Sequence, residues 1–241
     1  MKHILIASAA LVLALSPLRS QTPEEILNKH GEAIGGAKAF QAVTTQKIVG
    51  KLFFAPINQT MDMIITRKRP NQSRLEITNP EKTLMVSQVT DGTTAWQINS
   101  MIGMIEPTSL PGPAADTINR DAYMDDLYFG TYKSRGVSLE SKGSVEEEGK
   151  KYHQIQATYK DGHIQQRFYS DETGLLYKVV QNRPTGNGVV EATTVYSDYR
   201  QVEGLKFPFK IDGSLGAAIT IETVSLNVDV DDALFQMPKK P

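Results

Sequence analysis

The sequence predicts an α+β protein that is mainly antiparallel β, with ten or eleven strands in a strongly curved sheet or incomplete barrel. From Thr44 onward, short runs of alternating apolar and polar residues follow one another, separated by turn residues. Asp91-Gly92 and Asp161-Gly162 each lie between two such runs and predict hairpins. A single helical segment interrupts the strands, which is too little for the repeated crossovers of a parallel sheet.

The first twenty residues have the plan of a secretory signal peptide. Lys2 gives a basic start, residues 4–15 are mainly apolar, and Pro17 ends that run shortly before Ser20. The run is too short to span a bilayer, so we expect cleavage after Ser20 rather than a buried N-terminal helix. Residues 21–241 then form a single domain, because no linker rich in Pro, Gly or Ser and no fixed repeat divides them.

Composition excludes several classes of protein. The chain has no cysteine, which excludes disulfides, a thiol nucleophile, thiolate metal sites and an acylated N-terminal cysteine. The formal net charge is −1 and there is no basic stripe, which argues against nucleic-acid binding. We therefore expect an exported, soluble, non-lipidated protein, with the periplasm as its compartment and a monomer as its state.

A helix is expected at the start of the mature chain. Thr22 can cap it, Pro23 suits its first turn, and Glu25 stands three residues after the cap, as in a capping box. Gly35-Gly36 ends the helix. Because these glycines follow a helix rather than a strand, a phosphate-binding loop is not expected.

The region of residues 57–98 predicts one wall of an apolar pocket. Residues 57–66 alternate, so Met61, Met63 and Ile65 share a face. If Asp91-Gly92 is a two-residue turn, Ser87 faces Trp96, the only tryptophan.

The second hairpin has a similar expected register, which pairs Ile155 with Phe168 on an apolar face and leaves Gln156 and Arg167 on a wet one. The expected wall of the apolar pocket from both regions comprises Met61, Met63, Ile65, Leu75, Ile77, Met85, Val89, Trp96, Ile98, Ile155 and Phe168. Methionines suit a surface that repacks around varied apolar ligands, although ordinary core filling explains them equally well.

The insertion at residues 99–135 is expected to be a lid or plug. Three prolines punctuate it, and a short helix is predicted near Ile118. A helical insertion among antiparallel strands can lie against one face of the sheet.

Motifs for catalysis and metal binding are absent or weak. The sequence contains no Gly-x-Ser-x-Gly elbow, no His-Glu-x-x-His and no EF-hand loop. His153 and His163 lie at opposite ends of the second hairpin, so they cannot share a metal. Asp125-Asp126 is interpreted as a solvated turn or helix cap. No metal, cofactor or catalytic residue is therefore expected.

Several short segments together resemble the periplasmic lipoprotein carrier LolA and the broader outer-membrane lipoprotein-sorting family. Their order and spacing match that family over most of the mature chain. They are Lys68-Arg69-Pro70-Asn71, Arg74-Leu75-Glu76, Asn79-Pro80, Val86-Ser87, Asp91-Gly92-Thr93, Trp96, Asp171-Glu172-Thr173-Gly174-Leu175-Leu176, Ser197-Asp198-Tyr199-Arg200, Gly204-Leu205-Lys206-Phe207-Pro208 and Asp231-Asp232-Ala233-Leu234-Phe235-Gln236-Met237-Pro238.

The resemblance implies an unclosed antiparallel barrel of about eleven strands with a helical lid that holds acyl chains in its concave face. It implies that Arg69 ties the sheet to the lid, a role that suits the several donors of a guanidinium. It also implies an acylated lipoprotein or lipid as cargo, an inner-membrane ABC-type release complex and an outer-membrane acceptor. The insertion at residues 99–135 has no clear counterpart in that family.

Two other classes of function stay open from the sequence. A similar fold serves as the sensor half of RseB-type regulatory proteins, although these carry a second domain. An enzyme on the same scaffold is the third class, with His153, Asp198, Tyr199 and Arg200 as the first residues to test.

Overall fold

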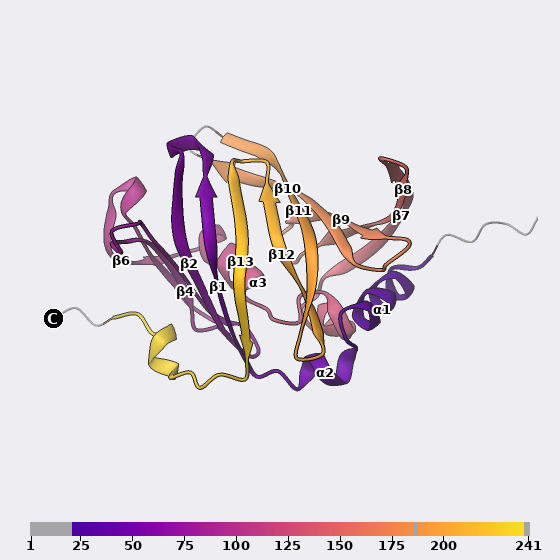
Figure 1. Ribbon diagram of the computed structural model, residues 1–241, viewed down its shortest axis with the longest axis horizontal. Helices are drawn as coiled ribbons and strands as arrows, with labels where there is room; N and C mark the ends of the chain where they lie inside the picture. Colours follow the sequence, from indigo (N-terminus) through magenta and orange to yellow (C-terminus); the bar gives the residue numbers. More distant parts are fainter. Residues whose placement is uncertain (1–20, 186–187, 239–241) are drawn as a thin grey trace, which may run out of the picture.

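The computed structural model describes residues 21–185 and 188–238, and the expected signal segment, residues 1–20, lies outside them. All thirteen strands in the described ranges belong to one antiparallel sheet (Figure 1). The strands are β1 (Thr45–Phe54), β2 (Gln59–Lys68), β3 (Gln72–Thr78), β4 (Leu84–Thr90), β5 (Ala95–Asn99), β6 (Met104–Leu110), β7 (Ser138–Glu147), β8 (Lys150–Thr158), β9 (Ile164–Ser170), β10 (Leu176–Thr185), β11 (Gly188–Val202), β12 (Leu205–Gly213) and β13 (Ala217–Leu226).

The helices are short and lie before the sheet, between β1 and β2, within the insertion and near the C-terminus. They are α1 (Pro23–Ala33), α2 (Ala37–Gln41), α3 (Pro113–Asp121), α4 (Thr131–Ser134) and four 3-10 turns, η1 (Ala55–Ile57), η2 (Ser100–Ile102), η3 (Tyr128–Gly130) and η4 (Asp232–Phe235). The capping box predicted for α1 is confirmed: Thr22 accepts a hydrogen bond from the Glu25 amide at 3.2 Å, and the Glu25 side chain accepts from the Thr22 amide at 2.8 Å. No helix of the described residues is long and apolar enough to cross a membrane.

The sheet consists of two meanders, β1–β6 and β7–β13, joined where the first strand pairs with the last. The β1–β13 register shifts at Val49/Gly50, and a β-carbon on Gly50 would stand 2.4 Å from the Thr220 carbonyl oxygen. Only glycine allows this close approach of the two backbones. The seam between the meanders therefore depends on Gly50.

The predicted fold class, a mainly antiparallel unclosed barrel with helices over it, is confirmed, and the sheet has thirteen strands where about eleven were expected. The insertion accounts for part of the difference, because Met104–Leu110 forms strand β6. Pro107 lies in this strand and hid it in the sequence. Proline is tolerated there because β6 is at the edge of the sheet, where an amide donor is not needed on the open side.

The expected register of the first hairpin is wrong by two residues. Val89 pairs with Trp96 and Ser87 with Ile98, with a connection of residues 91–94. The Asp91 carboxylate accepts hydrogen bonds from the amides of Thr93 and Thr94 at 2.8 and 2.7 Å, which holds both residues in the turn. Because the shift is even, the side chains keep the faces that alternation gives them.

The second hairpin slips by one residue, which has a larger consequence. Ile155 pairs with Arg167, and Phe168 pairs with Gln154. Residues 159–163 form the connection, closed by a hydrogen bond of 2.9 Å from the Tyr159 amide to the His163 carbonyl. An odd shift moves one strand's side chains to the other face, so Ile155 and Phe168 lie on opposite faces and Arg167 shares the face of Ile155.

Candidate functional site

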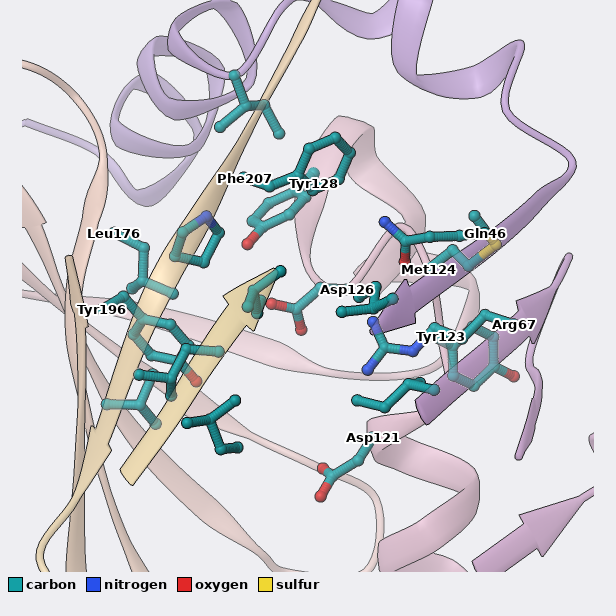
Figure 2. Close-up of a pocket in the computed structure, with 18 of the residues that line it drawn as sticks. Gln46, Arg67, Asp121, Tyr123, Met124, Asp126, Tyr128, Leu176, Tyr196 and Phe207 are labelled. Carbon is teal, nitrogen blue, oxygen red and sulfur yellow. The ribbon is translucent and has the colours of Figure 1, made fainter. Parts of the chain in front are cut away.

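The inner face of the sheet is defined as the face that carries Ile48, Met63 and Ile65. It continues across the seam through Ile219, Ile221 and Val224 of β13 and to Tyr196 and Val179 in the second meander. These residues, together with Ile34, Phe40 and part of the insertion, line a cavity of about 360 Å³ (Figure 2). The cavity therefore lies between the inner face and the segments that cover it.

A second cavity of about 850 Å³ adjoins the first. Its walls come from the inner face of β2–β5, from the loop between β8 and β9, and from helix α3 of the insertion. Five residues line both cavities: Ile65, Arg67, Arg120, Asp121 and Arg183. The segment of residues 99–135, called the lid insertion below, thus contributes to the walls of both spaces.

Some of the expected wall residues lie on the inner face. Met63, Ile65 and Leu75 line a cavity, and Met61 and Ile77 are buried beside them in one apolar cluster with Leu52 and Val86. Met85 stands at the irregularity between β3 and β4 and packs at the edge of this cluster, where its carbonyl accepts from the Ser100 hydroxyl at 3.1 Å.

The remaining expected wall residues line neither cavity. Val89, Trp96 and Ile98 share the outer face, where Val89 and Trp96 form a cluster with Phe235 of η4. The alternation pattern correctly predicts that these three residues share one face. The register of β3 against β4 shows that this is the outer face of the sheet, not the face that lines the cavities.

In the second meander the two expected residues separate. Ile155 packs in the cluster that includes Ile26 and Leu27 of α1, and Phe168 lies on the outer face with the Lys178 ammonium 4.4 Å from its ring centroid. Both assignments to the wall are thereby corrected, Phe168 because of the one-residue slip and Ile155 because α1 covers it.

Arg69 lies at the end of β2 and reaches three acceptors. Its Nη2 donates to the Phe40 carbonyl at 2.6 Å, its Nε donates to the Val43 carbonyl, and its Nη1 pairs with the Asp125 carboxylate in the lid insertion. One guanidinium therefore ties the sheet both to the chain around α2 and to the insertion. This is the geometry that the proposed lid contact requires, and whether the contact opens in function stays a prediction.

An ion pair between a buried arginine and a partly buried aspartate, which the sequence did not predict, stands at the centre of the site. Arg167 is 4% exposed, and its Nη1 donates to Asp126 Oδ1 at 3.0 Å while its Nη2 pairs with Oδ2. Burial acts to raise the pKa of Asp126, but the charge and the hydrogen bonds of Arg167, together with the charge of Arg135, outweigh it, and the pKa lies below its ordinary value. Asp126 is thus held as a carboxylate rather than exposed in a solvated turn.

His30 of α1 is another buried titratable group at this site. It is 1% exposed, its Nδ1 lies 3.0 Å from the Gly174 carbonyl, and its ring contacts Tyr128 with centroids 4.6 Å apart. Burial lowers its pKa to about 4. The ring is therefore neutral at neutral pH.

Arg67 is a further residue of the site that was not predicted from the sequence. Figure 2 shows its guanidinium reaching into the pocket, where the carboxylates of Asp121 and Asp126 also face. The alternation that placed Met63 and Ile65 on one face extends two residues further, to Arg67. Arg67 could have been found from this alternation, since charged residues are rarely buried in a core and one that continues an apolar stripe indicates a different role.

Among the described residues, no group of three or more His, Cys, Asp or Glu could hold a metal ion. Of the residues named for an enzymatic role, His153 pairs with Asp171, Asp198 pairs with Arg200, and the Tyr199 hydroxyl donates to the Leu176 carbonyl at 2.8 Å. The structure therefore does not bring His153 and these β11 residues into one hydrogen-bonded group.

No family model and no curated protein matches this chain. Solved structures do. A LolA superfamily protein from Nitrosomonas europaea is 15% identical with a TM-score of 0.57, over 90% of this chain and 98% of the other.

Two further solved structures have similar scores. A DUF1329 family protein from Desulfovibrio piger is 11% identical with a TM-score of 0.59, over 90% and 98% of the two chains. A putative outer membrane lipoprotein-sorting protein domain from Vibrio parahaemolyticus is 10% identical with a TM-score of 0.56, over 88% and 94%. The chain therefore has the LolA-like fold, an unclosed antiparallel barrel with a helical lid, as the resemblance in its sequence implied.

Proposed function

We propose that the protein is a periplasmic carrier, not an enzyme, which shields the acyl chains of lipoproteins or related lipids during transfer from the inner to the outer membrane. The observation that carries this proposal is the cavity of about 360 Å³ between the apolar inner face and the lid insertion. Its volume lies within the usual range of small-molecule sites, and the larger cavity beside it offers additional room.

The energetics of an acyl chain fit such a cavity. Each methylene removed from water gains roughly 0.8 kcal/mol, so a long chain in water gains about 10 kcal/mol from an apolar sheath. The wall supplies this sheath through branched aliphatic side chains on three adjoining strands, such as Ile48, Ile65 and Ile221. Nothing in this transfer requires a nucleophile or a metal.

A carrier must also release its cargo, and the lid insertion offers a means. Met124, Asp126 and Tyr128 of the insertion line the cavity, and Asp125 next to them pairs with Arg69. Entry of a chain therefore displaces side chains that otherwise occupy the space, and their return offsets part of the binding energy on release. An inner-membrane release complex and an outer-membrane acceptor would be the partners of this cycle.

A matched pair of substitutions on β2 tests the proposal. Ile65 lines both cavities, whereas the adjacent Ile64 pairs with Val49 and Glu76 on the opposite face. Ile65→Gln places an amide in the apolar wall and is expected to weaken binding of a fluorescent fatty acid on the order of tenfold. Ile64→Gln is expected to leave binding unchanged.

Native mass spectrometry of the protein from a periplasmic extract, with organic extraction of bound molecules, identifies the cargo. Acylated protein or lipid that co-purifies, in smaller amount with Ile65→Gln, supports the proposal. An empty protein that also fails to take up the fluorescent fatty acid refutes it.

A further inference from the structure

Arg67 is a cation at the point where the apolar stripe of β2 meets the charged part of the cavity lining, to which Arg120, Asp121 and Arg183 also contribute. It lies on the inner face of β2, paired in register with Gln46 and Ser73, and it lines both cavities. Its Nε is buried and makes no hydrogen bond within the described residues. A guanidinium has five donors and stays protonated in proteins. Arg67 therefore brings an unused positive charge and unused donors to the place where the two cavities adjoin.

The acidic groups around Arg67 are already occupied by other arginines. Asp126 forms the two-pronged pair with Arg167. The Asp121 carboxylate lies 3.5 Å from Arg183 Nη2 and 3.8 Å from Arg120 Nε. Over the described residues, Arg67 thus has no ion-pair partner, and its charge is balanced only at longer range by Asp121 and Asp126.

An unpaired charge within an apolar wall is unfavourable unless a ligand completes it. Burial lowers the pKa of Arg67, which shows the same cost of holding the charge away from water. Apolar contacts alone would be served better by a leucine or methionine at this position. A negatively charged group from the cargo would accept the free donors and remove the penalty.

We propose that Arg67 is the head-group site of the cavity, so that the cargo is an amphiphile whose carboxylate or phosphate lies against this guanidinium while its acyl chain follows Ile65 and Met63. This inference rests on the proposed carrier function and narrows it, from any acylated molecule to one with an anionic head. The two apolar residues lie two and four positions before Arg67 on the same face of the same strand, so the chain can extend along the wall directly from the head.

Three ligands with one sixteen-carbon chain test the head group: hexadecanoate, hexadecyl phosphate and hexadecanol. The wild-type protein is expected to bind one or both anions roughly 10- to 100-fold more tightly than the alcohol, which is the usual contribution of hydrogen bonds to a charged group. Comparison of the two anions identifies the source of the charge. Arg67→Gln is expected to remove the preference by weakening the binding of the anions much more than that of hexadecanol, and Arg67→Lys to keep part of the preference.

Arg74 provides the control, because it is a half-buried arginine on the neighbouring strand whose side chain packs on Trp96 on the outer face and pairs with Glu76. Arg74→Gln should keep the anion preference. Equal binding of all three ligands by the wild type, or a preference that survives in Arg67→Gln, overturns the head-group site and leaves the carrier function standing. Failure to bind any of the three overturns both.

A second measurement separates binding from structure. Removal of a partly buried cation without an ion-pair partner should not destabilise the empty protein, so thermal unfolding of Arg67→Gln is expected at the wild-type temperature or above it. A clearly lower unfolding temperature would show that Arg67 is held by structural partners and would contradict the proposal.

Discussion

The first meander has an apolar outer face and an apolar inner face, and the two differ in what covers them. On the outer face, Val89 and Trp96 are 0% and 3% exposed because Phe235 of η4, itself 1% exposed, covers them. On the inner face, Ile65 and Leu75 remain partly exposed to a cavity that also contains Arg67. The C-terminal segment therefore covers Val89 and Trp96 on the outer face, whereas the inner face keeps a cavity, for which we propose a ligand. An apolar stripe predicts that a face is covered but does not identify what covers it.

Among the largest expected effects is that of the ion pair on the inner side. Arg167→Met leaves Asp126, whose side chain is 31% exposed, as an unpaired carboxylate and is expected to lower the free energy of unfolding by about 3 kcal/mol. The double variant Arg167→Met, Asp126→Leu should recover most of this loss. Denaturant unfolding of both variants measures it, and a loss below about 1 kcal/mol in the single variant would show that the pair is not a structural anchor of the lid insertion.

Truncation of a side chain on the outer face should lower stability by a similar amount and leave the affinity for ligand unchanged. Phe235→Ala opens a cavity against Trp96 and is expected to lower the free energy of unfolding by about 3 to 5 kcal/mol, with unchanged affinity for fatty acid. The adjacent Leu234 is 40% exposed, so Leu234→Ala should stay within about 0.5 kcal/mol of the wild type. Weaker fatty-acid binding by folded Phe235→Ala would place cargo on the outer face.

Acidification should weaken the region of α1 that covers the inner face. Burial lowers the pKa of His30 from an ordinary 6.5 to about 4, so between these values the unfolded chain binds a proton that the folded chain does not. Stability is complete above pH 6.5 and falls as the pH drops toward 4, by roughly 3 kcal/mol from this group.

The His30→Gln variant lacks this titration. Its unfolding free energy, measured by denaturant titration at pH 7 and pH 4, should fall less than that of the wild type by about this amount. Parallel pH dependence of the two proteins would contradict the account of His30.

A smaller effect is expected at the contact between sheet and lid insertion. Lysine can hold a single charge near Asp125 but lacks the planar fork that also reaches the Phe40 and Val43 carbonyls. Arg69→Lys is expected to weaken the closed lid by on the order of 1 to 2 kcal/mol and to speed fatty-acid uptake and release roughly tenfold.

Stopped-flow fluorescence measures both rates. Lys68→Ala next to it, which removes a partly exposed pair with Asp232, should leave them unchanged. Rates of Arg69→Lys equal to the wild type would show that Arg69 does not control the lid.

The two faces also show what could be predicted from the sequence. The capping box of α1, the alternation of apolar and polar residues in strands and the hairpin signals that indicate an antiparallel sheet are all local patterns. The features that they predict are confirmed. Strand β6 was missed because Pro107 is permitted only at an edge, and edges are set by the whole sheet. Only part of the pocket wall was predicted correctly. The registers of the two hairpins are fixed by the hydrogen bonds of Asp91 and by the five-residue connection before Ile164, which short sequence patterns do not reveal.

The charged centre of the site required tertiary information. Arg167 and Asp126 are 41 residues apart and meet only when the lid insertion lies over β9. Arg67 was within reach, since it continues the stripe of Met63 and Ile65 on β2. Its lack of an ion-pair partner is the basis of the proposed head-group site. That lack could not be predicted, because it depends on the ion pairs that Arg120, Arg167 and Arg183 form with the nearby carboxylates.

The central claim, that cargo occupies the inner face while the outer face is structural, is tested most directly by a crystal structure with a fatty acid brominated on its chain. Anomalous diffraction locates the bromine without ambiguity. We predict a peak in the cavity beside Met63 and Ile65, with the carboxylate density at Arg67. A peak on the outer face beside Trp96, or saturated protein with no bromine in either cavity, would contradict the account.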